Sequence, residues 1–233
     1  MKLNLSIAAG AAVGLVIAGL AGFAGVYLTA FNPKPVARVA LPSSPSASPS
    51  GGVSGTWTVA SGSFVGYRVR EQLATLPAPS DAVGRTSAVT GTAACAINAD
   101  GTATIGALQV KADLTQLASD SSRRDGYVQD NSLGTSRFPT ASFVSDTGFS
   151  VPAAVVAGAK GTASVSGRMT IHGVTKQLTV PLQIQRNGGS IDIVGSFTFH
   201  WGDYGVAAPS VPVASVQSDP TIEISLVLTG GSL

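Results

Sequence analysis

The sequence predicts an all-β fold, an antiparallel β-barrel or sandwich with one short helix, preceded by an N-terminal transmembrane helix. Three observations predict it. Segments of strand length alternate apolar and polar residues with a period of two, which is typical of half-buried strands. Residues that favour tight turns separate these segments. Only 11% of the 233 residues are charged, which excludes a coiled coil and a charge-rich disordered chain.

The N-terminal segment is long and apolar. No residue from Leu5 to Phe31 is charged, and a helix of this length would span about 40 Å, more than the ~30 Å hydrocarbon core of a bilayer. A cleaved secretory signal is the alternative, but Arg38 stands two positions before Ala40, where a cleavage site needs a small residue. We therefore expect residues 1–40 to form a membrane anchor, or otherwise a signal, that leads the rest of the chain to the extracytoplasmic side.

Small residues recur every four positions within this segment, at Gly10, Gly14, Ala18 and Gly22. This spacing lets two membrane helices approach closely, so it would support a homodimer. A segment this rich in Ala and Gly also produces such a spacing by chance. Both interpretations stay open.

Residues 41–55 read LPSSPSASPSGGVSG. A segment of Pro, Ser and Gly cannot bury a core of its own, so we expect an extended, solvated linker. The folded body then occupies residues 56–233, which is long enough for one well-formed core.

The first half of this body contains a hairpin and the predicted helix. Two strands, which end at Ile97 and begin at Thr102, flank a turn over residues 98–101. The helix is expected over Ser121–Leu133, because Asp120 or Ser121 can cap its N-terminus.

The second half contains four alternating segments, over residues 164–171, 176–186, 191–201 and 221–228. In the second of them Leu178, Val180, Leu182 and Ile184 alternate with polar residues and with Pro181. Pro181 cannot donate a ladder hydrogen bond, so an edge or a bulge is expected there. Residues 186–189 read RNGG, which predicts a tight hairpin turn.

The charge distribution excludes nucleic acid as a partner. Lys2, Lys34 and Arg38 are three of the 14 basic residues, which leaves 11 basic against all 12 acidic residues in the body, a net charge of −1. Affinity for nucleic acid comes mostly from neutralised phosphates, and a neutral body does not supply it.

No residue pattern predicts catalysis, a cofactor or a metal site. Cys95 is the one cysteine, so neither an intrachain disulfide nor a thiolate zinc cluster can form, and a buried strand position is expected for it. His172 and His200 are the two histidines, and both are expected at strand ends or on the surface. Phosphate-binding, dinucleotide-binding and nucleophile-elbow motifs are absent from the sequence. We therefore expect a protein that is not an enzyme.

One segment resembles a known family. Residues 167–176, GRMTIHGVTK, are similar to the signature of the YceI-like, polyisoprenoid-binding family. Weaker similarities follow in the expected order, at residues 57–67, 124–128, 137–143 and 203–206. Together they extend over about residues 56–229.

The resemblance implies an extended, lipocalin-like barrel whose tunnel holds a long isoprenoid or fatty-acyl chain. By strand parity and by the resemblance, we nominate four aromatic residues for the tunnel wall and two residues of the helix for its mouth: Phe143, Phe197, Phe199 and Trp201, with Arg124 and Tyr127. The alternative is a barrel filled by its own side chains, which would act as a structural or interaction module.

Overall fold

The computed structural model describes residues 36–74, 78–211 and 214–230, and Ala37–Leu233 form one compact unit. The predicted anchor and its stripe of small residues lie outside the described residues, except for positions 36–40. None of the helices in the described part of the chain has the length and apolar character needed to cross a bilayer.

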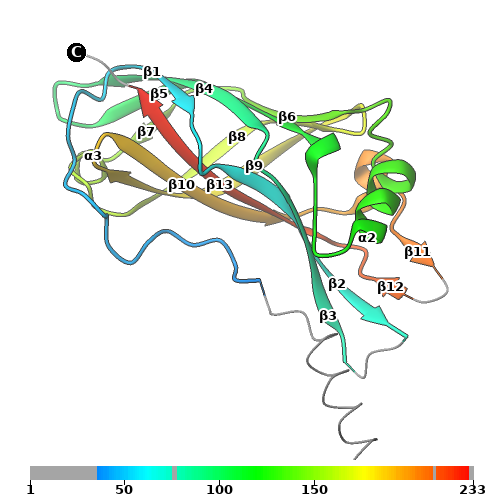
Figure 1. Ribbon diagram of the computed structural model, residues 1–233. Helices are drawn as coiled ribbons and strands as arrows, with labels where there is room; N and C mark the ends of the chain where they lie inside the picture. Colours follow the sequence, from blue (N-terminus) through cyan, green and yellow to red (C-terminus); the bar gives the residue numbers. More distant parts are fainter. Residues whose placement is uncertain (1–35, 75–77, 212–213, 231–233) are drawn as a thin grey trace, which may run out of the picture. The chain divides into compact units, whose positions relative to one another are not determined.

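Eight of the described strands form an antiparallel barrel (Figure 1). They are β1 (Gly55–Val59), β4 (Val89–Ile97), β5 (Ala103–Asp113), β6 (Thr140–Ser145), β8 (Gly161–Ile171), β9 (Val174–Asn187), β10 (Ser190–Thr198) and β13 (Thr221–Gly230). Pairing of β1 with the C-terminal part of β13 closes the barrel. The predicted all-β fold is thus confirmed.

Five shorter or peripheral strands extend this barrel. The N-terminal part of β13 pairs with β2 (Phe64–Leu73). Strand β2 also pairs with β3 (Ser80–Thr86) and with β12 (Ala214–Val216). Strand β12 pairs in turn with β11 (Ser210–Val211). At the other end of the barrel, β7 (Phe149–Val151) pairs with β5.

The alternation in β9 matches its burial. Val180, Leu182 and Ile184 are buried, and Pro181 between them is exposed. The turn at residues 188–189 connects β9 to β10, and Gly188 has a φ of 59°, a conformation that glycine adopts without strain. The hairpin predicted from RNGG is therefore present.

The predicted helix consists of two segments. Ser121 caps α2 (Ser122–Tyr127), because its hydroxyl accepts a hydrogen bond from the Arg124 backbone N–H. The π-helix η2 (Val128–Ser132) continues it. The described residues also form three shorter helices that the sequence pattern does not predict: η1 (Leu114–Gln116), α3 (Ala153–Val156) and η3 (Trp201–Tyr204).

Strand β10 is shorter than predicted, because it ends at Thr198 and Trp201 lies in η3. The last pair of its ladder with β13 is Thr198 with Thr221. The residue opposite Phe199 is Pro220, which has no N–H to donate, so the regular ladder stops there.

The Pro- and Ser-rich segment before β1, residues 37–54, is extended but packs against the barrel, and we call it the strap. Figure 1 shows it in blue, passing from the side of β2 and β3 to the end where α3 lies. There the Ala47 N–H donates to Asn187 Oδ1 at 3.1 Å, and the Ser50 N–H donates to the Gly188 carbonyl at 3.0 Å. Most residues of the strap are exposed, and these two hydrogen bonds attach its backbone to the end of β9 and the turn that follows.

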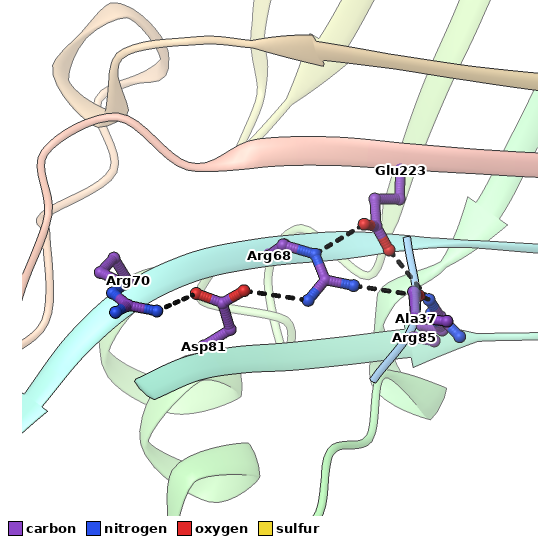
Figure 2. Close-up of polar contacts among 6 residues, drawn as sticks. All are labelled: Ala37, Arg68, Arg70, Asp81, Arg85 and Glu223. Atoms are coloured by element: carbon purple, nitrogen blue, oxygen red, sulfur yellow. Dashed lines mark hydrogen bonds and ion pairs between the residues drawn. The ribbon is translucent and has the colours of Figure 1, made fainter. Parts of the chain in front are cut away.

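A network of charged side chains holds the other end of the strap (Figure 2). The Ala37 carbonyl accepts hydrogen bonds from Nη2 of Arg68 and Nη2 of Arg85, at 3.2 and 3.1 Å. Both arginines also pair with Glu223, at 2.7 and 2.9 Å. Arg68 further contacts Asp81 at 3.2 Å. Burial alone would raise the pKa of Asp81, but hydrogen bonds from Arg70 and Arg68 outweigh it and lower that pKa.

Candidate functional site

The barrel encloses an apolar cavity of about 140 Å³. Strands on all sides contribute its wall, including Leu108 and Ala112 of β5, Met169 of β8 and Ile193 of β10. A cavity with such a wall stays dry and binds apolar groups.

All four aromatic residues nominated from the sequence lie on this wall: Phe143, Phe197, Phe199 and Trp201. Phe199 packs edge to face against Trp201 and Tyr204, with ring centroids 5.5 and 5.4 Å apart. The ring of Phe143 lies over Gly167 of β8, where a Cβ atom would be 2.5 Å from its Cζ. A larger residue at Gly167 would therefore displace part of the wall.

Short helices cover one end of this cavity. Leu114 begins η1 and Leu117 follows it, and Val128 begins η2 and Leu133 follows it. All four side chains are buried. The helix predicted from Ser121 therefore serves as a cover with an apolar inner face.

Tyr67 also lies on the wall, although it is not among the residues nominated from the sequence. It shares strand parity with Val65 and Val69 in β2, and that alternation is the signal that could have found it. Its ring packs on Gly84, where a Cβ atom would be 2.4 Å from Cε1. Burial raises the pKa of Tyr67 to about 12, although nearby Arg124 opposes the shift, so its hydroxyl stays protonated at neutral pH.

Arg124 and Tyr127, nominated for the mouth, do not lie on the wall that the described residues form. Arg124 Nη2 donates to Glu71 Oε1 at 2.6 Å, and Nη1 donates to Asp120. The pair with Glu71 links α2 to β2, and the pair with Asp120 is local to the N-terminus of α2. Tyr127 is the half-buried last residue of α2.

A second, smaller cavity of about 50 Å³ lies toward α3. Val53 of the strap, Trp57, Cys95 and Val155 contribute to its wall. Cys95 is buried in β4, as expected, and burial raises the pKa of its thiol. Leu108 and Ile193 line both cavities, so their side chains lie between the two. The apolar interior therefore extends along the barrel from η2 to α3.

The two histidines lie outside both cavity walls. His172 and Gly173 form the turn between β8 and β9, and His172 has a φ of 52°. Its ring packs on Phe138 with centroids 4.6 Å apart. His200 is exposed and pairs with Asp219 at 2.8 Å. No group of three or more metal-binding side chains is found in the described part of the chain.

The signature GRMTIHGVTK thus forms the β8–β9 hairpin, whose Met169 and Ile171 face the cavity. The sequence pattern of the YceI-like domain matches residues 57–228. The chain belongs to the YceI-like family. This match begins within β1, ends within β13 and includes all the barrel strands between them.

Two solved structures share the fold of this YceI-like chain. A polyisoprenoid-binding domain from Saccharophagus degradans, implicated in plant cell wall breakdown, is 18% identical, with a TM-score of 0.55 over 75% of this chain and 98% of that one. Burkholderia cenocepacia BcnA is 17% identical, with a TM-score of 0.50 over 70% and 95%. Among curated proteins, none matches the chain.

Proposed function

We propose that this YceI-like barrel binds one long apolar chain, of the isoprenoid or fatty-acyl type, along its interior. The observation that supports this most strongly is the apolar cavity of about 140 Å³ with four aromatic residues on its wall. The Saccharophagus degradans domain, which has the same fold, is a polyisoprenoid-binding domain, and this likeness supports the same class of ligand. Carriage, storage and sensing of the chain are all compatible with such a site.

Burial of methylene groups alone can hold an apolar chain in the larger cavity, with no charged partner. Each methylene moved from water into the protein interior contributes about 0.8 kcal/mol. Ten buried methylenes contribute about 8 kcal/mol before the costs of association and chain ordering are subtracted. Selectivity then comes from the length and width of the interior, because the wall offers few polar groups.

The test is extraction of the purified full-length protein with organic solvent, followed by mass spectrometry. We expect apolar chains to co-purify with the protein in roughly stoichiometric amounts. A protein that carries no such chain and binds none when incubated with a lipid extract would favour the alternative, a barrel that acts as an interaction module.

We further propose that the barrel lies on the extracytoplasmic side of a membrane, because a long uncharged segment precedes it in the sequence. A reporter that is active only after export, fused after Leu233, should be active. Activity of a cytoplasmic reporter alone at this position would contradict the proposed orientation.

A further inference from the structure

A buried cation lies at the α3 end of the apolar interior. Arg186 follows Val180, Leu182 and Ile184 on the inward-facing side of β9, and it is 8% exposed. Its side chain contributes to the wall of the second cavity, whose other residues are apolar. Charged residues are almost never this buried unless they are paired.

The hydrogen bonds of Arg186 go to neutral groups. Nη2 donates to the carbonyls of Ser50 and Gly51 at 2.6 and 2.5 Å, and Nη1 donates to the Val156 carbonyl at 3.3 Å. Nε is buried and has no hydrogen-bond partner among the residues that the structure describes. Nor does any carboxylate in this part of the chain form an ion pair with the guanidinium.

Arg68 of β2, a second buried arginine among the described residues, shows what Arg186 lacks. Glu223 and Asp81 lie 2.7 and 3.2 Å from its guanidinium. Burial of an uncompensated charge is costly, and a bound anion removes that cost. The α3 end of the interior therefore combines an apolar wall with an unused donor and an uncompensated positive charge.

From these observations we infer that Arg186 recognises the acidic group of a long-chain carboxylic acid whose chain begins in the second cavity. The inference rests on the proposed function, because the bound chain would have to extend past Leu108 and Ile193, which line both cavities, into the larger one. Apart from Arg186 the wall of this cavity is apolar, which suits one acidic group at the end of an apolar chain better than a sugar with several hydroxyl groups. A carboxylate oxygen is a stronger acceptor than a carbonyl, so it can accept from Nε or replace the Ser50 and Gly51 carbonyls at Nη2.

The experiment compares two probes of equal length, dodecanoate and 1-dodecanol, on full-length protein stripped of lipid. Each probe displaces the neutral fluorophore N-phenyl-1-naphthylamine. We expect the wild type to prefer dodecanoate by at least about tenfold, the ratio that a hydrogen bond to a charged group supports. Arg186→Met should lose this preference, and Arg186→Lys should retain part of it. The matched control is Arg168→Met, because Arg168 is exposed on the outside of β8 and should leave the ratio unchanged.

The outcomes separate the two proposals. Equal affinity of the wild type for both probes, or an unchanged preference in Arg186→Met, would overturn the role of Arg186 and leave apolar binding intact. Loss of the preference in Arg124→Met instead would place the acid at the opposite end, and would also overturn it. If neither probe displaces the fluorophore from the wild type, both proposals fail.

A crystal structure of the wild type with dodecanoate decides the question even where Arg186→Met fails to fold. The inference requires the carboxylate within hydrogen-bond distance of the Arg186 guanidinium. A carboxylate at Tyr67 or in solvent would overturn it.

Discussion

Replacement of Ala112 by Leu tests whether the space inside the barrel is empty in the unliganded protein. Ala112 lies in β5, is 4% exposed and contributes to the wall of the larger cavity. Its neighbour on β6, Ala141, also lies on the wall, so the site is bordered by a small side chain. Leu adds three carbon atoms that can extend into the cavity.

The expected magnitude follows from the burial of these three carbons. At about 0.8 kcal/mol for each, Ala112→Leu stabilises the lipid-free protein by up to about 2.4 kcal/mol. The same carbons occupy space that a ligand needs, so the affinity for 1-dodecanol should fall by up to about 50-fold. In a barrel already filled by side chains, the substitution would instead destabilise by about 1–3 kcal/mol through overpacking.

Urea unfolding of lipid-free protein measures the first effect, and fluorophore displacement measures the second. Ala96→Leu is the matched control, because Ala96 is exposed on β4 and its free energy of unfolding should change by less than about 0.5 kcal/mol. Destabilisation by Ala112→Leu together with unchanged dodecanol affinity would refute a ligand-sized cavity at this position.

Three further predictions concern the wall and the charged network. Phe199→Leu keeps the wall apolar but changes its shape, so the chain length of the co-purified lipid should shift in mass spectrometry. If the folded variant co-purifies with the same chain lengths as the wild type, Phe199 does not contribute to chain-length selectivity. Glu223→Gln leaves Arg68 and Arg85 without their shared carboxylate, which is 2% exposed, and should destabilise the protein by about 3–5 kcal/mol in urea unfolding; a loss below about 1 kcal/mol would contradict this. The pKa of Asp81 is lower in the folded state, so its contribution to stability is complete well above pH 4 and is lost as the pH falls through the folded-state pKa. The free energy of unfolding of Asp81→Asn should therefore depend less on pH in the acid range than that of the wild type. Identical pH profiles of the two proteins would contradict this prediction.

Strand alternation predicted much of the barrel and part of the site from the sequence. The parity of β9 and β13 separates inward from outward side chains, and the parity of β10 places Phe197 on the cavity wall. Successive side chains of a strand point to opposite faces, so the two-residue period is enough to tell inward from outward positions. The alternation of β2 likewise places Tyr67 on the same face as Val65, toward the cavity.

Alternation could not predict that the barrel contains a cavity. A filled and a hollow barrel share one periodic pattern, and the difference depends on how the side-chain volumes of all strands add up in space. The cover over the larger cavity could not be predicted for the same reason. Leu117 and Leu133 belong to one buried cluster only once η1 and η2 lie over the end of the barrel.

The contacts of the strap and of Arg186 could not be predicted for a related reason. The pattern of residues 186–189 predicts only a turn, yet Arg186 binds the Ser50 carbonyl, 136 positions earlier in the chain. The composition of the strap indicates that it has no core of its own. It does not indicate which of its carbonyls accept hydrogen bonds from Arg186. Contacts between segments this far apart in sequence depend on the closed barrel.

A crystal structure of the protein purified from its native cells would show whether a lipid chain occupies the barrel interior. We expect continuous, elongated density inside the barrel that contacts Phe143, Phe199 and Trp201 and matches a chain found by mass spectrometry of the same sample. An interior occupied by ordered water, or filled by the protein's own side chains, would contradict lipid binding inside the barrel.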